Sequence, residues 1–177
     1  MININDYTKI ILIGSGGSGK STFAKQLGGV TGLPVIHLDN EFWRPGWVET
    51  PRDEWVEKQK QLISGEKWII DGNYGGTLEM RFVAADLVIF LDINPVICVW
   101  SAARRTGKKR SDLPQELTEP KIFSKDFREF AKWIWNYPKT GRNKVIALHE
   151  RYPDKAFLQI KSRRELKKYL KVKRNNG

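Results

Sequence analysis

Residues 9–24 read Lys-Ile-Ile-Leu-Ile-Gly-Ser-Gly-Gly-Ser-Gly-Lys-Ser-Thr-Phe-Ala. The stretch matches the pattern G-x-x-x-x-G-K-[ST] at Gly14, Gly19, Lys20 and Ser21. A short β-branched, apolar run at 10–13 precedes the loop and predicts a buried parallel strand, and the apolar spacing after Lys20 predicts a helix. A glycine-rich turn by itself would only join two elements. All four fixed positions between a strand and a helix indicate a site for nucleotide phosphates.

The residue types of this loop suit a triphosphate. Backbone N–H groups must approach the phosphates closely, and glycines leave room for that approach. The N-terminus of the following helix adds partial positive charge. We expect Lys20 to reach the β- and γ-phosphates and the Ser21 hydroxyl to bind Mg²⁺. The residues expected to hold the nucleotide here are Gly14, Ser15, Gly16, Gly17, Ser18, Gly19, Lys20, Ser21 and Thr22.

Composition is that of a globular protein with one domain. The chain has 177 residues, 40% of them hydrophobic and 29% charged, which is enough to bury a substantial core. No apolar run approaches the roughly 20 residues of a membrane span. Residues 1–7 lack the basic and apolar regions of a secretory signal. Because Cys98 is the single cysteine, no intramolecular disulfide can form, and we expect a cytoplasmic protein.

The net charge of +11 is concentrated in residues 104–110, 139–144 and 161–174. Part of it suits a protein that binds phosphates. The remainder is either a solvated basic face or a surface that attracts nucleic acid without sequence preference, since such binding is mostly counterion release. The sequence leaves open whether the chain is a monomer or a homodimer.

Five apolar runs separated by helical segments predict an α/β fold with a parallel sheet covered on both faces. Residues 142–152 fit either a strand or a helix, and their apolar spacing favours the helix. The predicted strands are 10–13, 33–38, 67–70, 87–91 and 155–160.

An aromatic segment at 39–50 follows the second predicted strand, at the edge where open α/β sheets bind ligands. Trp43, Trp47 and, from the next such edge, Tyr74 are candidates for lining an acceptor pocket. A small satellite core under the loop explains the same residues equally well.

Two aspartates at predicted strand ends are candidates for chemistry. Asp39 would accept a proton from an attacking hydroxyl or help to hold Mg²⁺, unless it only forms a turn. Asp71 follows Trp-Ile-Ile, a run similar to a short Walker B segment, and would orient the Mg²⁺ shell. Both residues compete for the metal role, and the sequence leaves that choice open.

Arginines that close over the phosphates stabilise the charge that develops in phosphoryl transfer. Arg104 and Arg105 end the helix predicted after the fourth strand, and Arg110 lies in the following segment, 106–120, which has no apolar periodicity. Arg81 is a candidate for binding a phosphate of the acceptor. The alternative for each is a surface arginine.

Taken together, these motifs resemble P-loop kinases of the adenylate-kinase-like group. More narrowly, the chain is similar to the bacterial DNA topology modulation (FlaR-related) proteins. The narrower resemblance rests on the phosphate loop, on His-Leu-Asp followed by Trp43 and Pro-Gly-Trp, on Trp-Ile-Ile-Asp-Gly-Asn-Tyr, on Phe-Leu-Asp, and on Lys-Trp-Ile-Trp-Asn at 132–136.

The resemblance implies a three-layer α/β/α P-loop NTPase fold with the strand order 2-3-1-4-5. It implies an acceptor-binding segment near 40–65, a lid near 106–120, ATP and Mg²⁺ as cofactors, and a contact between the nucleotide base and Ser162, Arg163 and Arg164. Gly16 stands where adenylate kinases proper carry a proline, and Asp-Gly-Asn-Tyr replaces their Gly-Phe-Pro-Arg turn. The leading hypothesis is therefore an ATP-dependent kinase for a small acceptor such as a nucleoside or nucleotide. The alternatives are a nucleotide-dependent nucleic-acid-binding regulator and an ATPase without a defined acceptor.

Overall fold

The computed structural model describes residues 2–106, 114, 117 and 121–170. Within these residues, five strands form one parallel sheet in the order β2-β5-β1-β6-β7. They are β1 (Lys9–Gly14), β2 (Val35–His37), β5 (Trp68–Asp71), β6 (Leu87–Leu91) and β7 (Ala156–Ile160). Numbered within this sheet alone, the order is 2-3-1-4-5, which confirms the expected fold class. The predicted lid at 106–120, including Arg110, lies outside the described residues except for 106, 114 and 117.

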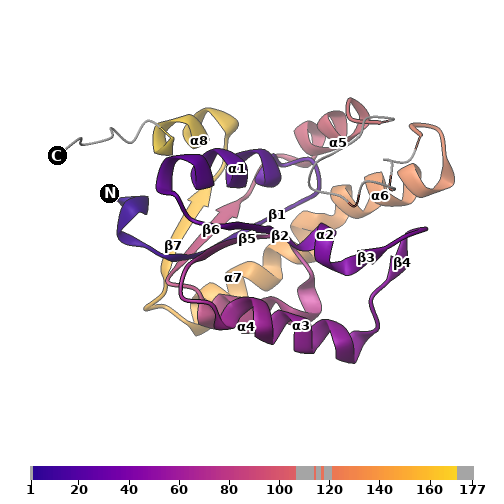
Figure 1. The fold of residues 1–177 in the computed structure, drawn as a ribbon. Coiled ribbons are helices and arrows are strands. Elements are labelled where there is room, and N and C mark those ends of the chain that lie inside the picture. The colour runs from indigo at the N-terminus through magenta and orange to yellow at the C-terminus, as the bar shows by residue number, and fades with distance from the viewer. Residues whose placement is uncertain (1, 107–113, 115–116, 118–120, 171–177) are drawn as a thin grey trace.

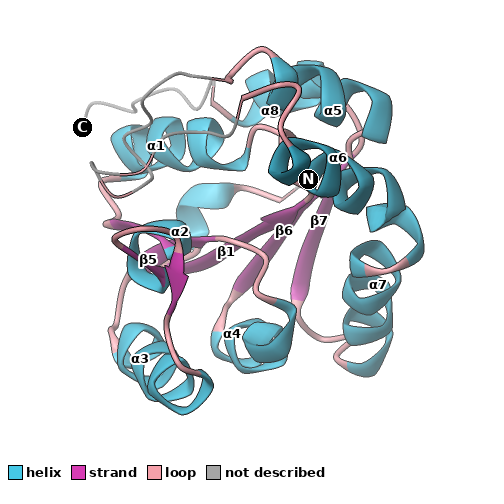
Figure 2. Cartoon of the chain, turned by 90° about the vertical axis from the view of Figure 1, so that its right-hand side faces the viewer, coloured by secondary structure: helices cyan, strands magenta, loops and turns pink. Residues whose placement is uncertain are grey.

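Helices cover both faces of the sheet, which gives three layers (Figures 1 and 2). One face carries α1 (Lys20–Thr31), α5 (Pro95–Ala103) and α8 (Arg163–Tyr169). The opposite face carries α3 (Arg52–Ser64), α4 (Leu78–Ala84) and α7 (Gly141–Arg151). Residues 142–152 are thus helical, as their spacing favours. The amphipathic α6 (Lys125–Asn136) directs Phe127 and Ile134 into the core on the α1 side.

The core consists of two apolar layers separated by the sheet. Successive side chains of β1 alternate between them: Ile10 and Leu12 pack on the α1 side, while Ile11 and Ile13 pack on the α4 side. All four are fully buried. Burial on both faces explains why the strand is a continuous apolar run rather than an alternating one. Burial of each such side chain contributes about 1.5–3 kcal/mol to folding. This burial holds the carboxyl end of β1, where the phosphate loop begins, in a fixed position.

The segment after β2 differs from the expected irregular aromatic loop. β2 is shorter than the predicted strand, and α2 (Leu38–Phe42) begins directly after it. A two-stranded antiparallel hairpin, β3 (Trp43–Arg44) and β4 (Val48–Glu49), follows. Gly46 and Trp47 both have positive φ, +78° and +60°, and consecutive left-handed residues are what a tight hairpin turn requires. Asp39 therefore lies in the first turn of a short helix.

Three 3₁₀ helices complete the described elements: Ile4–Asp6, Gly75–Thr77 and Tyr137–Lys139. Among the described residues, no helix is long and apolar enough to span a membrane.

Candidate functional site

The phosphate loop joins β1 to α1 and is closed against α5. Gly17 has a φ of +74°, and a Cβ at this position would overlap the carbonyl oxygen of Cys98. The Lys20 Nζ donates a hydrogen bond of 3.0 Å to the carbonyl oxygen of Ser15. A glycine is required at 17 because the loop backbone passes directly over the backbone of α5.

Two later parts of the chain support the same loop. The rings of Phe130 and Trp133 on α6 lie where a Cβ at Gly16 would point. Arg163, the first residue of α8, donates hydrogen bonds of 2.6 Å to the carbonyl oxygen of Gly17 and to the Ser101 Oγ. The loop is therefore enclosed by α5, α6 and α8 together.

The resemblance to adenylate-kinase-like proteins implies that the turn after β7 contacts the nucleotide base. The structure brings Arg163 of that turn to the phosphate loop. Ser162 is the N-cap of α8, where its Oγ accepts a hydrogen bond from the Glu165 N–H. Arg164 is exposed. The base contact itself stays a prediction.

Asp71 ends β5 and pairs with a histidine on the neighbouring strand. Its Oδ2 lies 3.0 Å from the His37 Nδ1, and the residue is 4% exposed. The Oδ1 is buried and has no hydrogen-bond partner among the described residues. Since buried polar atoms are normally satisfied, an oxygen in this state fits a carboxylate that orients water or a cation beside the phosphates.

Asn73 connects the turn after β5 to the phosphate loop. Its Oδ1 accepts hydrogen bonds from the Gly14 N–H, at 3.1 Å, and from the Tyr137 hydroxyl, at 3.4 Å. Burial raises the pKa of Tyr137, and the nearby Asp92 adds to the shift, so the phenol stays a donor. Asn73 was not among the predicted site residues, although its place in Asp-Gly-Asn-Tyr was the available signal.

Arg81 is enclosed behind the turn after β5 and is not exposed for the predicted contact with a phosphate of the acceptor. The side chain is fully buried, and its guanidinium donates to the carbonyl oxygens of Gly72 (2.9 Å), Asn73 (2.7 Å) and Tyr74 (3.0 Å). Burial lowers the pKa of Arg81 to about 9, opposed by Tyr74 and Asp71, so the group stays charged at neutral pH. Arg81 fixes the turn that carries the candidate site and has no surface on which to receive an acceptor.

Asp39 and Tyr74 form the opposite side of the site. The Tyr74 hydroxyl donates a 2.7 Å hydrogen bond to the Asp39 Oδ1. Burial raises the pKa of Tyr74, and the Asp39 carboxylate raises it further. The phenol is therefore a permanent donor that orients this carboxylate.

The aromatic residues beside Asp39 form a cluster around Phe42. The Phe42 ring centroid lies 4.9 Å from that of Trp43, 5.0 Å from Trp55 and 4.6 Å from Tyr74. Trp55 is buried and Trp47 is 38% exposed. The cluster has features of a small satellite core and of a pocket lining: Phe42 and Trp55 form the core, and Trp47 lies at its exposed edge.

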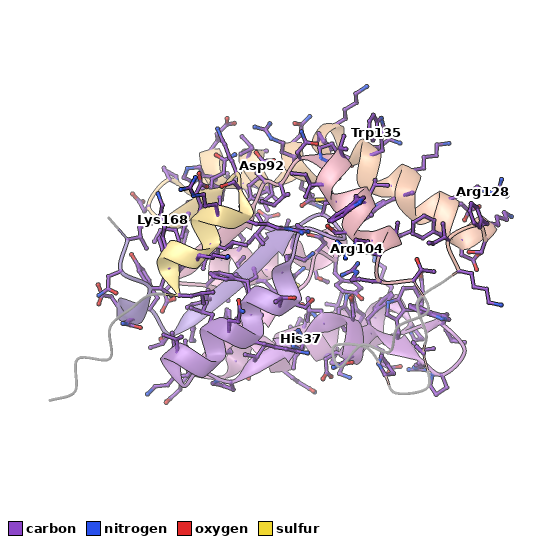
Figure 3. The ribbon with its side chains drawn as sticks, turned by 90° about the horizontal axis from the view of Figure 1, so that it is seen from above. His37, Asp92, Arg104, Arg128, Trp135 and Lys168 are labelled. Atoms are coloured by element: carbon purple, nitrogen blue, oxygen red, sulfur yellow. The ribbon has the colours of Figure 1, made fainter. Side chains whose placement is uncertain are left out.

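The two arginines after α5 differ in placement. The Arg104 guanidinium lies 4.6 Å from the centroid of the Trp100 ring, and the residue is exposed at the end of α5 (Figure 3). Arg105 is half-buried. Burial raises the pKa of the Cys98 thiol, and the charges of Lys20, Arg163 and Arg105 oppose that shift. Arg105 thus belongs to the cationic group around the phosphate loop, whereas Arg104 stacks on Trp100.

The residues present fit a nucleotide with a divalent cation. Gly16 and Gly17 let the loop backbone pass close to the rings of Phe130 and Trp133 and to the Cys98 carbonyl oxygen. A glycine-rich loop folded in this way can present successive backbone N–H groups to phosphates. Ser21 lies in the first turn of α1, beside Lys20. Among the residues that the structure describes, no group of three or more His, Cys, Asp or Glu side chains is placed to hold a metal ion. Mg²⁺ is usually held by few protein groups together with water and substrate phosphates.

The fold and this loop together define a P-loop protein with the fold of small-molecule kinases. A shikimate kinase from Acinetobacter baumannii in complex with shikimate matches with a TM-score of 0.59 and 14% identity, over 94% of this chain and 96% of that one. A shikimate kinase from Bacteroides thetaiotaomicron matches with a TM-score of 0.53 and 15% identity, over 93% and 94%. A gluconokinase from Sinorhizobium meliloti 1021 matches with a TM-score of 0.52 and 12% identity, over 92% and 87%.

At these identities the similarity shows the fold alone. No protein-family model and no curated protein matches the sequence. The broad resemblance to P-loop kinases is thus confirmed at the level of fold, and the narrower resemblance to DNA topology modulation proteins is not confirmed.

Proposed function

We propose that the protein transfers the γ-phosphate of ATP to a hydroxyl group of a small acceptor. The observation that carries this proposal is the convergence of three groups at one edge of the sheet. The phosphate loop follows β1, Asp71 ends β5, and Asp39 follows β2 by two residues. These strands are neighbours in the sheet, and His37 and Asp71 are paired in register.

Asp39 is the proposed general base. As the acceptor oxygen forms its bond to the γ-phosphorus, the bond to the β,γ-bridging oxygen breaks and ADP leaves. The hydroxyl proton passes to the Asp39 carboxylate. Tyr74 supports this role because its hydrogen bond to the Oδ1 holds the carboxylate in one orientation. Asp71 is a poorer base because it is buried and paired with His37.

The cations around the loop would stabilise the transferred phosphoryl group. The Lys20 Nζ lies at the loop, where it donates to the Ser15 carbonyl oxygen, and we propose that this ammonium binds the β- and γ-oxygens of the nucleotide. Arg105 would add positive charge from the side of α5. Ser21, with Asp71 acting through its unsatisfied oxygen, would hold Mg²⁺, which neutralises phosphate charge when bound. Arg104 and Arg110 are proposed to approach the phosphates in the complex.

The acceptor is proposed to lie beside Trp43, Trp47 and Tyr74, next to Asp39. Shikimate and gluconate are the acceptors that the names of the similar structures suggest. Acceptors of the size of these two hydroxy acids should therefore be tested first.

The test measures ADP formation from ATP and Mg²⁺ across sugar acids, polyols, nucleosides, nucleotides and short oligonucleotides. We expect at least one small acceptor to raise the rate above the basal hydrolysis. Removal of the loop ammonium in Lys20→Ala should lower that rate by roughly 100- to 1,000-fold. The exposed Lys168→Ala, on α8, is the matched control and should leave it unchanged (Figure 3).

Asp39→Asn should lower kcat for the acceptor and leave ATP binding intact. The proposal is wrong if no acceptor exceeds the basal rate. Tight, salt-resistant binding of oligonucleotides in that case would favour the nucleic-acid-binding alternative, for which the net charge of +11 is the supporting observation.

A further inference from the structure

A cavity of about 310 Å³ lies between the turn after β5 and the start of α7. We name it the α7 cavity. Its polar rim is formed by Asn73, Gly75, Thr140 and Lys144, and its walls include the rings of Trp133 and Tyr137. The volume is within the range of small-ligand sites, which are largely apolar with a few polar groups.

The rim of the α7 cavity is positively charged. The Lys144 Nζ donates a hydrogen bond to the Gly75 carbonyl oxygen. An ammonium group carries three N–H donors, so two remain beside the bond to Gly75, on a residue that lines the cavity. No acidic side chain lines the cavity among the described residues. The only charge on the described lining is therefore that of a lysine.

The beginning of α7 adds to this positive potential. Thr140 precedes the helix, but its Oγ1 donates to the Asn136 carbonyl oxygen and does not cap α7. The first N–H groups of the helix start at Gly141, which also lines the cavity. Uncapped N–H groups and the positive end of a helix dipole favour an anion.

The α7 cavity adjoins both halves of the candidate site. Asn73, on its rim, binds the Gly14 N–H of the phosphate loop. Trp133, in its wall, lies against Gly16 of the same loop. On the other side, Gly75 directly follows Tyr74, which binds Asp39. A molecule in the cavity thus lies next to the turn after β5, whose residues Asn73 and Tyr74 contact the phosphate loop and Asp39 respectively.

A second, smaller cavity beside Asp92 lacks this charge. It measures about 190 Å³ and includes Arg142, but the Arg142 Nε is paired with the Asp92 Oδ2 at 3.0 Å. The ion pair neutralises the arginine. Of the two cavities, the one at Lys144 is the one suited to an anion.

We propose that the α7 cavity binds an anionic group of the acceptor, a carboxylate or a phosphate monoester, with Lys144 as its counter-ion. This inference rests on the proposed function and narrows the acceptor class to hydroxy acids and phosphorylated alcohols. Lys144 positions the acceptor and takes no part in the bond exchange. Its substitution should therefore change KM and spare kcat.

The first experiment detects anion binding without turnover. A non-hydrolysable ATP analogue with Mg²⁺ fills the phosphate loop, and calorimetry then follows titration with malonate or with inorganic phosphate at constant ionic strength. We expect binding to the wild type and to Lys139→Met, and at least tenfold weaker binding to Lys144→Met. Lys139 is a matched control because it is an exposed lysine that does not line the cavity. Equal affinity in Lys144→Met, or no binding of either anion to the wild type, overturns the inference.

The second experiment uses acceptor pairs that differ in one anionic group. Gluconate is compared with sorbitol for a carboxylate, and nucleoside monophosphates with nucleosides for a phosphate. We expect the anionic member of a pair to be phosphorylated, with a KM raised at least tenfold and a kcat within about twofold in Lys144→Met. Turnover of a neutral acceptor with an unchanged KM overturns the inference and leaves the proposed function standing. Anion binding that depends on Lys144 without turnover of any acceptor supports the cavity assignment and counts against the proposed function.

Discussion

Replacement of Arg81 by methionine separates a structural role from an acceptor-binding role. Methionine keeps much of the apolar volume but removes every donor, so the carbonyl oxygens of Gly72, Asn73 and Tyr74 lose their partner. Hydrogen bonds to a charged group are worth about 1.5–3 kcal/mol each, and the cost of burying the guanidinium offsets part of their sum. Leaving these carbonyl oxygens without a donor costs about 1–3 kcal/mol each, so we expect a net loss of about 3–5 kcal/mol. A loss of that size is a large fraction of a typical folding free energy of about 5–15 kcal/mol.

The assay is urea unfolding followed by circular dichroism, with thermal unfolding in parallel. For a chain of this length, each kcal/mol lowers Tm by about 2–4 °C, so we expect a decrease of roughly 6–20 °C. The exposed Arg52→Met, at the start of α3, is the control and should change the free energy of unfolding by less than about 0.5 kcal/mol. The reasoning fails if Arg81→Met unfolds within 1 kcal/mol of the wild type while the KM for an acceptor rises more than about tenfold, because that result would return Arg81 to the acceptor site.

Two further predictions concern the loop and Tyr74. In Gly17→Ala, a residue at φ +74° carries a Cβ that overlaps the Cys98 carbonyl oxygen, and the left-handed strain alone costs about 1–2 kcal/mol. Calorimetry should therefore show at least tenfold weaker ATP binding to this variant. Unchanged affinity would contradict the close approach of the loop to α5. Burial raises the pKa of Tyr74 above its usual value near 10, so the stability linked to its proton is present below pH 10 and is lost as the pH rises further. In urea unfolding at pH 9 and pH 11, Tyr74→Phe should therefore lose less stability between the two values than the wild type; an equal loss would contradict the shift.

The fold was predictable because the decisive signals are local. The run at 10–13 is apolar without alternation, which only a strand buried on both faces requires, and the motif that follows fixes the turn into α1. The segment at 39–50 was not predictable in the same way. The loop of its hairpin has Gly46 and Trp47 both at positive φ, and a tryptophan gives no sign of that conformation.

The candidate site was predictable in its phosphate loop and less so around it. A motif identifies residues that are adjacent in sequence, whereas Asn73 and Lys144 reach the site from separate elements through hydrogen bonds to distant parts of the chain. Arg163 was predicted only through the family resemblance, and its contact is with the Gly17 carbonyl oxygen. Arg81 shows the opposite limit: its position after a glycine-rich turn suited an acceptor ligand, but only the packed structure shows the guanidinium enclosed by carbonyl oxygens.

The enclosure of the phosphate loop by Cys98, Phe130 and Arg163 has a consequence for how the protein is made. The helices that surround the loop are synthesised some 80 to 145 residues after it. Contacts of such large sequence separation form slowly, because the intervening chain must first be ordered. The loop is thus complete only after these later helices have docked, and nucleotide binding reports that docking.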